Sequence, residues 1–91
     1  MARLEESEID GQLGMVSGWK RDGDAIVKEF TCGDFKGSVA FVNKVLPIAE
    51  QMDHHPDVAI SWDTVTLTVS THSEGGLTAN DFELAKRIDA G

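Results

Sequence analysis

The chain has 91 residues and a net charge of -8, from 16 Asp and Glu against 8 Lys and Arg. Nucleic acids and anionic membrane surfaces bind clustered positive charge, so this acidic balance argues against both as partners. No stretch approaches the roughly 20 apolar residues that span a membrane, and the N-terminal residues lack the apolar core of a secretion signal. The length fits a single domain, residues 1–91, with a modest core.

The chain has one cysteine, Cys32, and therefore cannot form an internal disulfide. A lone cysteine suits a reducing compartment, so we expect a cytoplasmic protein. No histidine lies near Cys32 in the sequence, which argues against a role as a nucleophile.

The N-terminal part of the chain predicts a helix followed by a hairpin. An amphipathic pattern over residues 4–15 predicts a short helix that ends near Gly14. The Asp22-Gly23 pair then predicts a two-residue turn between two strands. This register places Trp19 opposite Ile26, and we expect Trp19 to lie in the core.

The longest helix is predicted over residues 35–52, after Asp34 as its N-cap. Pro47 lies inside it and is expected to kink it or to leave one carbonyl unpaired. The helix must end before Pro56, because the residue before a proline avoids the α region. The apolar residues at helical spacing are Phe35, Val39, Val42, Leu46 and Ala49, with Phe41 and Val45 beside them.

Residues 58–71 alternate between apolar and polar side chains and predict a second hairpin with one buried face. If Asp63 and Thr64 form the turn, Trp62 faces Val65. Extension of that ladder places His55 opposite His72.

A capping box of Thr78 and Asp81 predicts a last helix that ends at Ala90–Gly91. The order of elements is then α-β-β-α-β-β-α. Two hairpins without βαβ alternation predict an α+β fold, in which a four-stranded antiparallel sheet carries helices on one face.

The candidate chemistry lies in three histidines: His54, His55 and His72. An imidazole gives and takes protons near neutral pH, so histidines that converge from the two ends of a hairpin form a candidate acid–base site. A single histidine is more often a surface or packed residue than a catalytic one, and the convergence of all three is what favours the acid–base site. A metal site is the chemical alternative, but adjacent side chains of an extended segment point apart, so chelation by both His54 and His55 is awkward.

Two carboxylates lie close to these histidines in the sequence or in the predicted fold. Asp81 can cap its helix, and it can also orient a histidine. Glu50 lies one helical turn before His54 and can pair with a histidine or remain solvated.

The chain resembles the pterin-4a-carbinolamine dehydratases over about residues 9–88. The residues that carry the resemblance form the motifs E-x-x-x-H-H-P at 50–56, T-H at 71–72 and G-G-L-T-x-x-D at 75–81, with an aromatic residue at Trp62. Gly18-Trp19 and Glu29-Phe30 fit the same pattern.

This resemblance implies a 4a-hydroxytetrahydrobiopterin dehydratase, a hydro-lyase that converts the 4a-hydroxytetrahydropterin to quinonoid dihydropterin and water. It implies no metal and no organic cofactor. His54 and His72 match the histidines that transfer protons, and His55 matches the one that mainly holds the substrate. Asp81 and Glu50 match supporting carboxylates. The implied substrate-binding residues are His54, His55, Pro56, Thr71, His72, Ser73 and Glu74.

The resemblance also implies a homodimer or homotetramer. Two alternatives from the same family remain open: a protein-interaction module of the kind that stabilises a transcription-factor dimer, and a pterin-binding paralogue in molybdopterin metabolism. Two positions depart from the family pattern. Val58 stands where several relatives carry tryptophan, so a stacking wall is missing there, and Pro47 interrupts the long helix.

Overall fold

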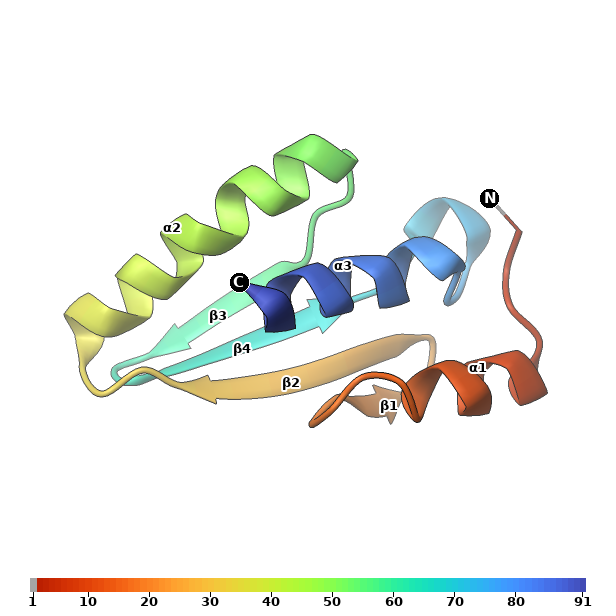
Figure 1. Cartoon of the computed structure of the whole chain (residues 1–91), viewed down its shortest axis with the longest axis horizontal. Helices are drawn as coiled ribbons and strands as arrows, with labels where there is room; N and C mark the ends of the chain where they lie inside the picture. The colour runs from red at the N-terminus through yellow and green to blue at the C-terminus, as the bar shows by residue number, and fades with distance from the viewer. Residues whose placement is uncertain (1) are drawn as a thin grey trace.

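The computed structural model describes residues 2–91. The chain folds into a four-stranded antiparallel sheet with three α-helices on one face (Figure 1). The strand order is β1-β2-β4-β3, so the second hairpin adds β4 next to β2 and leaves β3 at an edge. The elements are α1 (Glu6–Leu13), β1 (Lys20–Asp22), β2 (Ala25–Thr31), α2 (Phe35–Met52), β3 (Asp57–Ser61), β4 (Thr64–Val69), the 3-10 helix η1 (His72–Glu74) and α3 (Ala79–Ala90). The predicted α+β class and element order are confirmed.

The three helices begin and end where local capping residues predict. Gly14 is the C-cap of α1. Asp34 is the N-cap of α2, and its side chain accepts a hydrogen bond from the Gly37 N–H at 2.7 Å. Thr78 is the N-cap of α3. α2 runs on through Pro47, which is exposed, so the proline removes one backbone donor without ending the helix.

The turn of the first hairpin lies one residue later than the Asp22-Gly23 pair predicts. Asp22 pairs with Ala25, so Gly23 and Asp24 form the turn. Gly23 has φ +60° at the first turn position, where glycine is accommodated without strain.

The turn of the second hairpin differs from the prediction in the opposite direction. Ser61 pairs with Thr64 and Ile60 with Val65, so Trp62 and Asp63 form the turn. Trp62 therefore does not face Val65 but lies at the tip of the hairpin, with φ +50° and 67% of its surface exposed. Because the pairing shifts by two positions, the alternating faces of the strands are preserved.

The core lies between the sheet and the helices. β2 and β4 contribute their inward-facing residues, and α3 contributes its whole apolar face. Trp19 is buried, as predicted, and its indole N–H donates to Asp89 Oδ2 at 3.0 Å. The fully buried apolar residues are Ile26, Val65, Leu67, Val69, Leu77, Phe82, Leu84 and Ala85.

Only part of the apolar stripe predicted for α2 faces this core. Val45 and Ala49 are buried, whereas Phe35 and Leu46 each expose 57% of their surface. The helix is rotated so that Ser38 is buried, and its hydroxyl donates to the Trp62 carbonyl at 2.7 Å. One turn of α2 is thus fixed to the tip of the second hairpin by a hydrogen bond.

Within residues 2–91, no helix combines the length and the apolar character needed to cross a membrane.

Gly37→Ala is expected to lower the free energy of unfolding, because a Cβ at this position would lie 2.1 Å from the Cys32 carbonyl oxygen. Forcing an atom into such a space costs about 1–3 kcal/mol. Gly11→Ala is the matched control, since no atom lies within 4 Å of its added Cβ inside α1. Gly11→Ala is expected to raise the free energy of unfolding by about 0.5–1 kcal/mol. Urea unfolding at one protein concentration measures both, and equal stability of the two variants would contradict this account of the start of α2.

Candidate active site

The candidate residues come from two segments at the same end of the β3–β4 hairpin. His54, His55 and Pro56 connect α2 to β3, and Thr71 and His72 follow β4. Asp53 is the C-cap of α2 and adopts the left-handed conformation with φ 50°. The His54 N–H then donates to the Ala49 carbonyl at 3.0 Å, which closes the helix end and fixes where the histidine pair begins.

Asp81 connects the two segments through its side chain. One carboxylate oxygen, Oδ1, lies 2.5 Å from His54 Nε2. The other, Oδ2, accepts hydrogen bonds from the Thr71 hydroxyl at 2.9 Å and from the Thr78 N–H at 2.8 Å. The Thr71 and Thr78 hydroxyl oxygens lie 2.9 Å apart and complete the network. Asp81 is fully buried, and its polar contacts join His54, Thr71 and the start of α3.

The two predicted roles of Asp81 therefore coexist. Its Oδ2 forms the capping box with Thr78, as the sequence predicts for the first turn of α3. Its Oδ1 remains free for His54, whose side chain is only 12% exposed. A buried carboxylate is stable when it is hydrogen-bonded and paired, and Asp81 meets both conditions.

Glu50 and His55 form a second, more exposed pair on the same segment. His55 Nε2 contacts Glu50 Oε2, and both side chains are more than half exposed. Of the two alternatives for Glu50, the structure shows the histidine pair. Solvent weakens such a pair, so it orients His55 without confining it.

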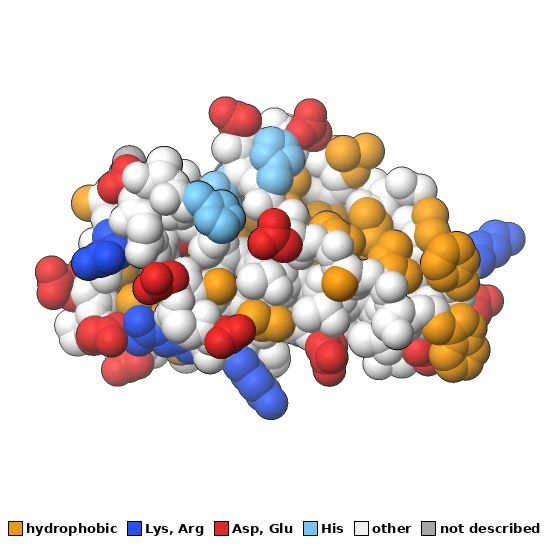
Figure 2. All heavy atoms as spheres, turned by 180° about the vertical axis from the view of Figure 1, so that it is seen from behind, with side chains coloured by type: hydrophobic (Ala, Val, Ile, Leu, Met, Phe, Trp, Pro, Cys, Tyr) orange, Lys and Arg blue, Asp and Glu red, His pale blue; other side chains and the backbone are white. Residues whose placement is uncertain are grey.

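His72 is the first residue of η1 and is exposed. The segment is held in place by Thr71, which pairs with Gly76 across the turn. The prediction that His55 lies directly opposite His72 is wrong, because extension of the observed ladder places Ser70 opposite His55. Histidine side chains nevertheless gather on one face of the molecule, beside carboxylates (Figure 2).

Comparison with known proteins identifies the family. The model of the family described as pterin 4 alpha carbinolamine dehydratase matches residues 2–91. The chain belongs to this family. A protein of Sulfolobus acidocaldarius, assigned provisionally as a pterin-4-alpha-carbinolamine dehydratase, is 48% identical over 87 residues, which are 96% of this chain and 96% of the relative. A protein of Thermosynechococcus vestitus with the same provisional assignment is 49% identical over 94% of this chain and 90% of its own length.

The fold agrees with a solved member of the family. The crystal structure of a transcriptional coactivator/pterin dehydratase from Brucella melitensis superposes with a TM-score of 0.91 at 34% identity, over 97% of this chain and 96% of that one. The resemblance drawn from the histidine motifs is thus confirmed at the level of the family.

Residues 2–91 contain no group of three or more His, Cys, Asp and Glu side chains placed to hold a metal ion. His54 and His55 direct their Nε2 atoms to two different carboxylates, on α3 and on α2. The Nδ1 atom of each ring lies outside these carboxylate contacts.

The structure also brings two residues close to His72 that sequence reasoning missed. A hollow of about 210 Å³ beside His72 is lined by Asp24 and Ser70 as well. Asp24 precedes β2 and Ser70 follows β4, and these two strands pair with Ile26 opposite Val69. The sequence shows that each residue flanks a predicted strand. It does not show that β2 and β4 pair, so it could not place the two residues together.

Proposed function

We propose that this chain dehydrates a 4a-hydroxytetrahydropterin to the quinonoid dihydropterin. The reaction breaks the bond between C4a and the hydroxyl oxygen, which leaves as water after it takes up a proton. The N5 proton is released as the C4a–N5 double bond forms. One group must therefore give a proton and another must take one, and no external oxidant or reductant is required. Histidines suit both tasks near neutral pH.

The observation that carries this proposal is the bond between the buried Asp81 and His54. With Nε2 held at 2.5 Å from Asp81 Oδ1, the ring of His54 cannot rotate freely, and its Nδ1 is fixed in direction. Such orientation of an imidazole by a buried carboxylate sets which nitrogen carries the proton. His54 is thereby prepared to transfer a proton at Nδ1.

His72 supplies the second proton transfer in this proposal. It follows Thr71, whose hydroxyl is bound to the same Asp81, so the two histidines are positioned by one carboxylate. His55 holds the substrate, with Glu50 orienting its ring. The substrate is contacted by Pro56 and by the segment of Thr71, His72, Ser73 and Glu74.

The physiological role that follows is recycling of the tetrahydrobiopterin cofactor used by aromatic amino-acid hydroxylases. The provisional names of the relatives support the dehydratase activity. We place the reaction in the cytoplasm, because a single cysteine is typical of a reducing compartment.

His54→Ala and His72→Ala are each expected to lower kcat by about 10²–10⁴-fold, the usual contribution of one acid–base group. His55→Ala is expected to raise KM more than it lowers kcat. The measurement follows breakdown of a 4a-hydroxytetrahydropterin generated in the assay by a hydroxylase. Gln12→Ala on α1 is the control and should match the wild type.

Circular dichroism must show that each variant folds. Wild-type acceleration that survives in a folded His54→Ala/His72→Ala double variant would contradict the assignment of the site. A wild type that does not accelerate the reaction would contradict the dehydratase proposal itself.

The homo-oligomer is proposed to form through the apolar face of α2 and β3. Phe35, Val39 and Leu46 are exposed on α2, and Val58 and Ile60 are exposed on the edge strand β3. Exposed apolar patches and open strand edges are typical of association surfaces. Figure 2 shows apolar side chains on the same face as the histidines, from beside them toward one end of the molecule. The same face would serve the alternative role of an interaction module, which needs no histidine.

Leu46→Glu is expected to shift the protein toward the monomer, because it places a charge within the exposed apolar row of α2. Asn43→Glu adds the same charge to an exposed polar position of the same helix and should leave the assembly intact. Sedimentation velocity over a range of concentrations distinguishes the states. An unchanged assembly in Leu46→Glu would show that α2 is not the contact.

A further inference from the structure

Asp24 and Ser70 share a hollow with His72 and have no role in the mechanism above. The hollow measures about 210 Å³, and the backbone of Gly75 and Gly76 forms another part of its wall. A second hollow of about 450 Å³ adjoins it, since Asp24 and Gly76 line both. Asp24 thus lies at the junction of the two hollows, on the side of His72.

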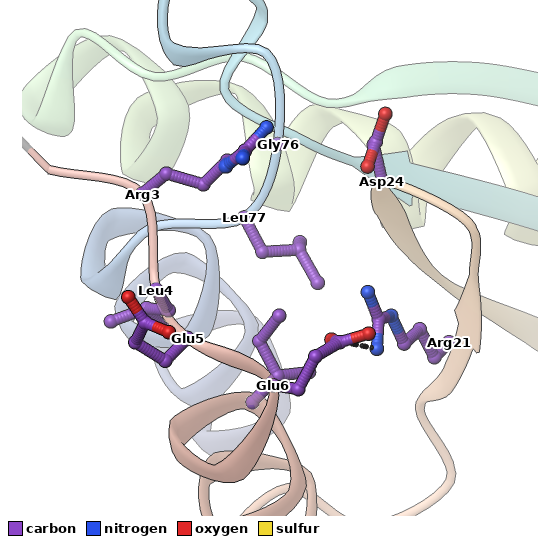
Figure 3. A pocket seen from close by; sticks show the side chains of 9 residues that line it. Arg3, Leu4, Glu5, Glu6, Arg21, Asp24, Gly76 and Leu77 are labelled. Carbon is purple, nitrogen blue, oxygen red and sulfur yellow. Dashed lines mark hydrogen bonds and ion pairs between the residues drawn. The ribbon is translucent and has the colours of Figure 1, made fainter.

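The carboxylate of Asp24 is available although two arginines lie near it. Arg21 donates to Glu6 at 2.5 Å, and Arg3 Nη1 donates to the Gly75 carbonyl at 3.4 Å. Figure 3 shows Arg21 turned toward Glu6, and it shows Asp24 across the opening from Arg3 and Gly76. Within residues 2–91, the Asp24 side chain has no hydrogen-bond or ion-pair partner. Neither arginine pairs with Asp24, so both of its carboxylate oxygens can accept hydrogen bonds from a ligand in the hollow.

A carboxylate presents two acceptor oxygens side by side, and it matches two parallel N–H donors. A pterin carries such a pair on its pyrimidine edge, formed by N3–H and the 2-amino group. The reacting atoms C4a and N5 lie beyond this edge, at and next to the fusion of the two rings. A ring with its donor edge at Asp24 therefore presents its reacting centre toward His72.

We propose that Asp24 binds the N3–H and 2-amino edge of the pterin and so sets the orientation of the ring against His72. This inference rests on the proposed dehydratase function and adds to it a substrate-binding residue from the first hairpin. The substituent on C6 lies at the opposite end of the bicyclic ring from the amino group, so it points away from Asp24. The site consequently recognises the pterin ring and tolerates different 6-substituents.

The test compares the binding of 6-methylpterin and 6-methyllumazine, which differ in carrying an amino or an oxo group at C2. The wild type is expected to bind 6-methylpterin about 10- to 100-fold more tightly, as for a hydrogen bond to a charged acceptor. Asp24→Asn keeps the shape of the side chain and suits a turn, but it offers one acceptor in place of two. It is expected to bind the two compounds with nearly equal affinity in isothermal titration calorimetry.

Asp22→Asn is the matched control, because it removes the same charge from the same hairpin at an exposed position that lines neither hollow. It should keep the wild-type preference, and loss of preference in both variants would overturn the proposal in favour of a net-charge effect. An Asp24→Asn protein that still prefers 6-methylpterin would overturn the role of Asp24 and leave the dehydratase proposal standing. A wild type that binds neither compound would overturn both.

Discussion

The buried carboxylate of Asp81 is the interaction on which the site depends. A fully buried carboxylate is costly unless its oxygens are hydrogen-bonded, and removal of one partner from such a pair costs roughly 3–5 kcal/mol. Asp81 meets this requirement with three groups: His54 after α2, Thr71 after β4 and Thr78 at the start of α3. These contacts join the segments that follow α2 and β4 to the start of α3. The hydrogen bonds that stabilise one buried carboxylate therefore also hold the segments of the candidate site next to one another.

This constraint explains the different environments of the histidines. His54 is nearly buried and held by a carboxylate that has no access to solvent, whereas His55 is paired with an exposed one. A proton-transfer group benefits from a fixed position, and a group that must admit and release a substrate benefits from mobility. The division of roles between His54 and His55 in the proposed mechanism follows this difference in burial.

Much of the fold could be predicted because its signals are local. Asp34 and the Thr78–Asp81 capping box act within one turn of their helices, and the alternation in β4 depends only on neighbouring side chains. The register of the second hairpin could not be predicted, because Trp62 occupies a turn position with positive φ that sequence rules assign to other residues. The buried face of α2 was missed because Ser38 is buried through a hydrogen bond to a distant carbonyl.

Some residues of the candidate site could likewise be predicted from the sequence, and others could not. The histidines and Asp81 stand in recognisable motifs, so the sequence alone indicates them. Asp24 and Ser70 reach the site only because β2 pairs with β4, and strand order is a property of the whole sheet. Residues that a fold contributes through non-local pairing leave no short motif, and they appear only once the strands are arranged in space.

The tautomer of His54 tests the central role of Asp81 most directly. A long-range 15N–1H NMR spectrum of the histidine-labelled protein at about pH 8, where an ordinary imidazole is neutral, reports which ring nitrogen carries the proton. Because Nε2 faces Asp81 Oδ1 at 2.5 Å, the account predicts a proton on Nε2 and a bare Nδ1. A ring protonated only on Nδ1, or one that averages between both tautomers, would contradict the proposal that Asp81 prepares His54 for proton transfer.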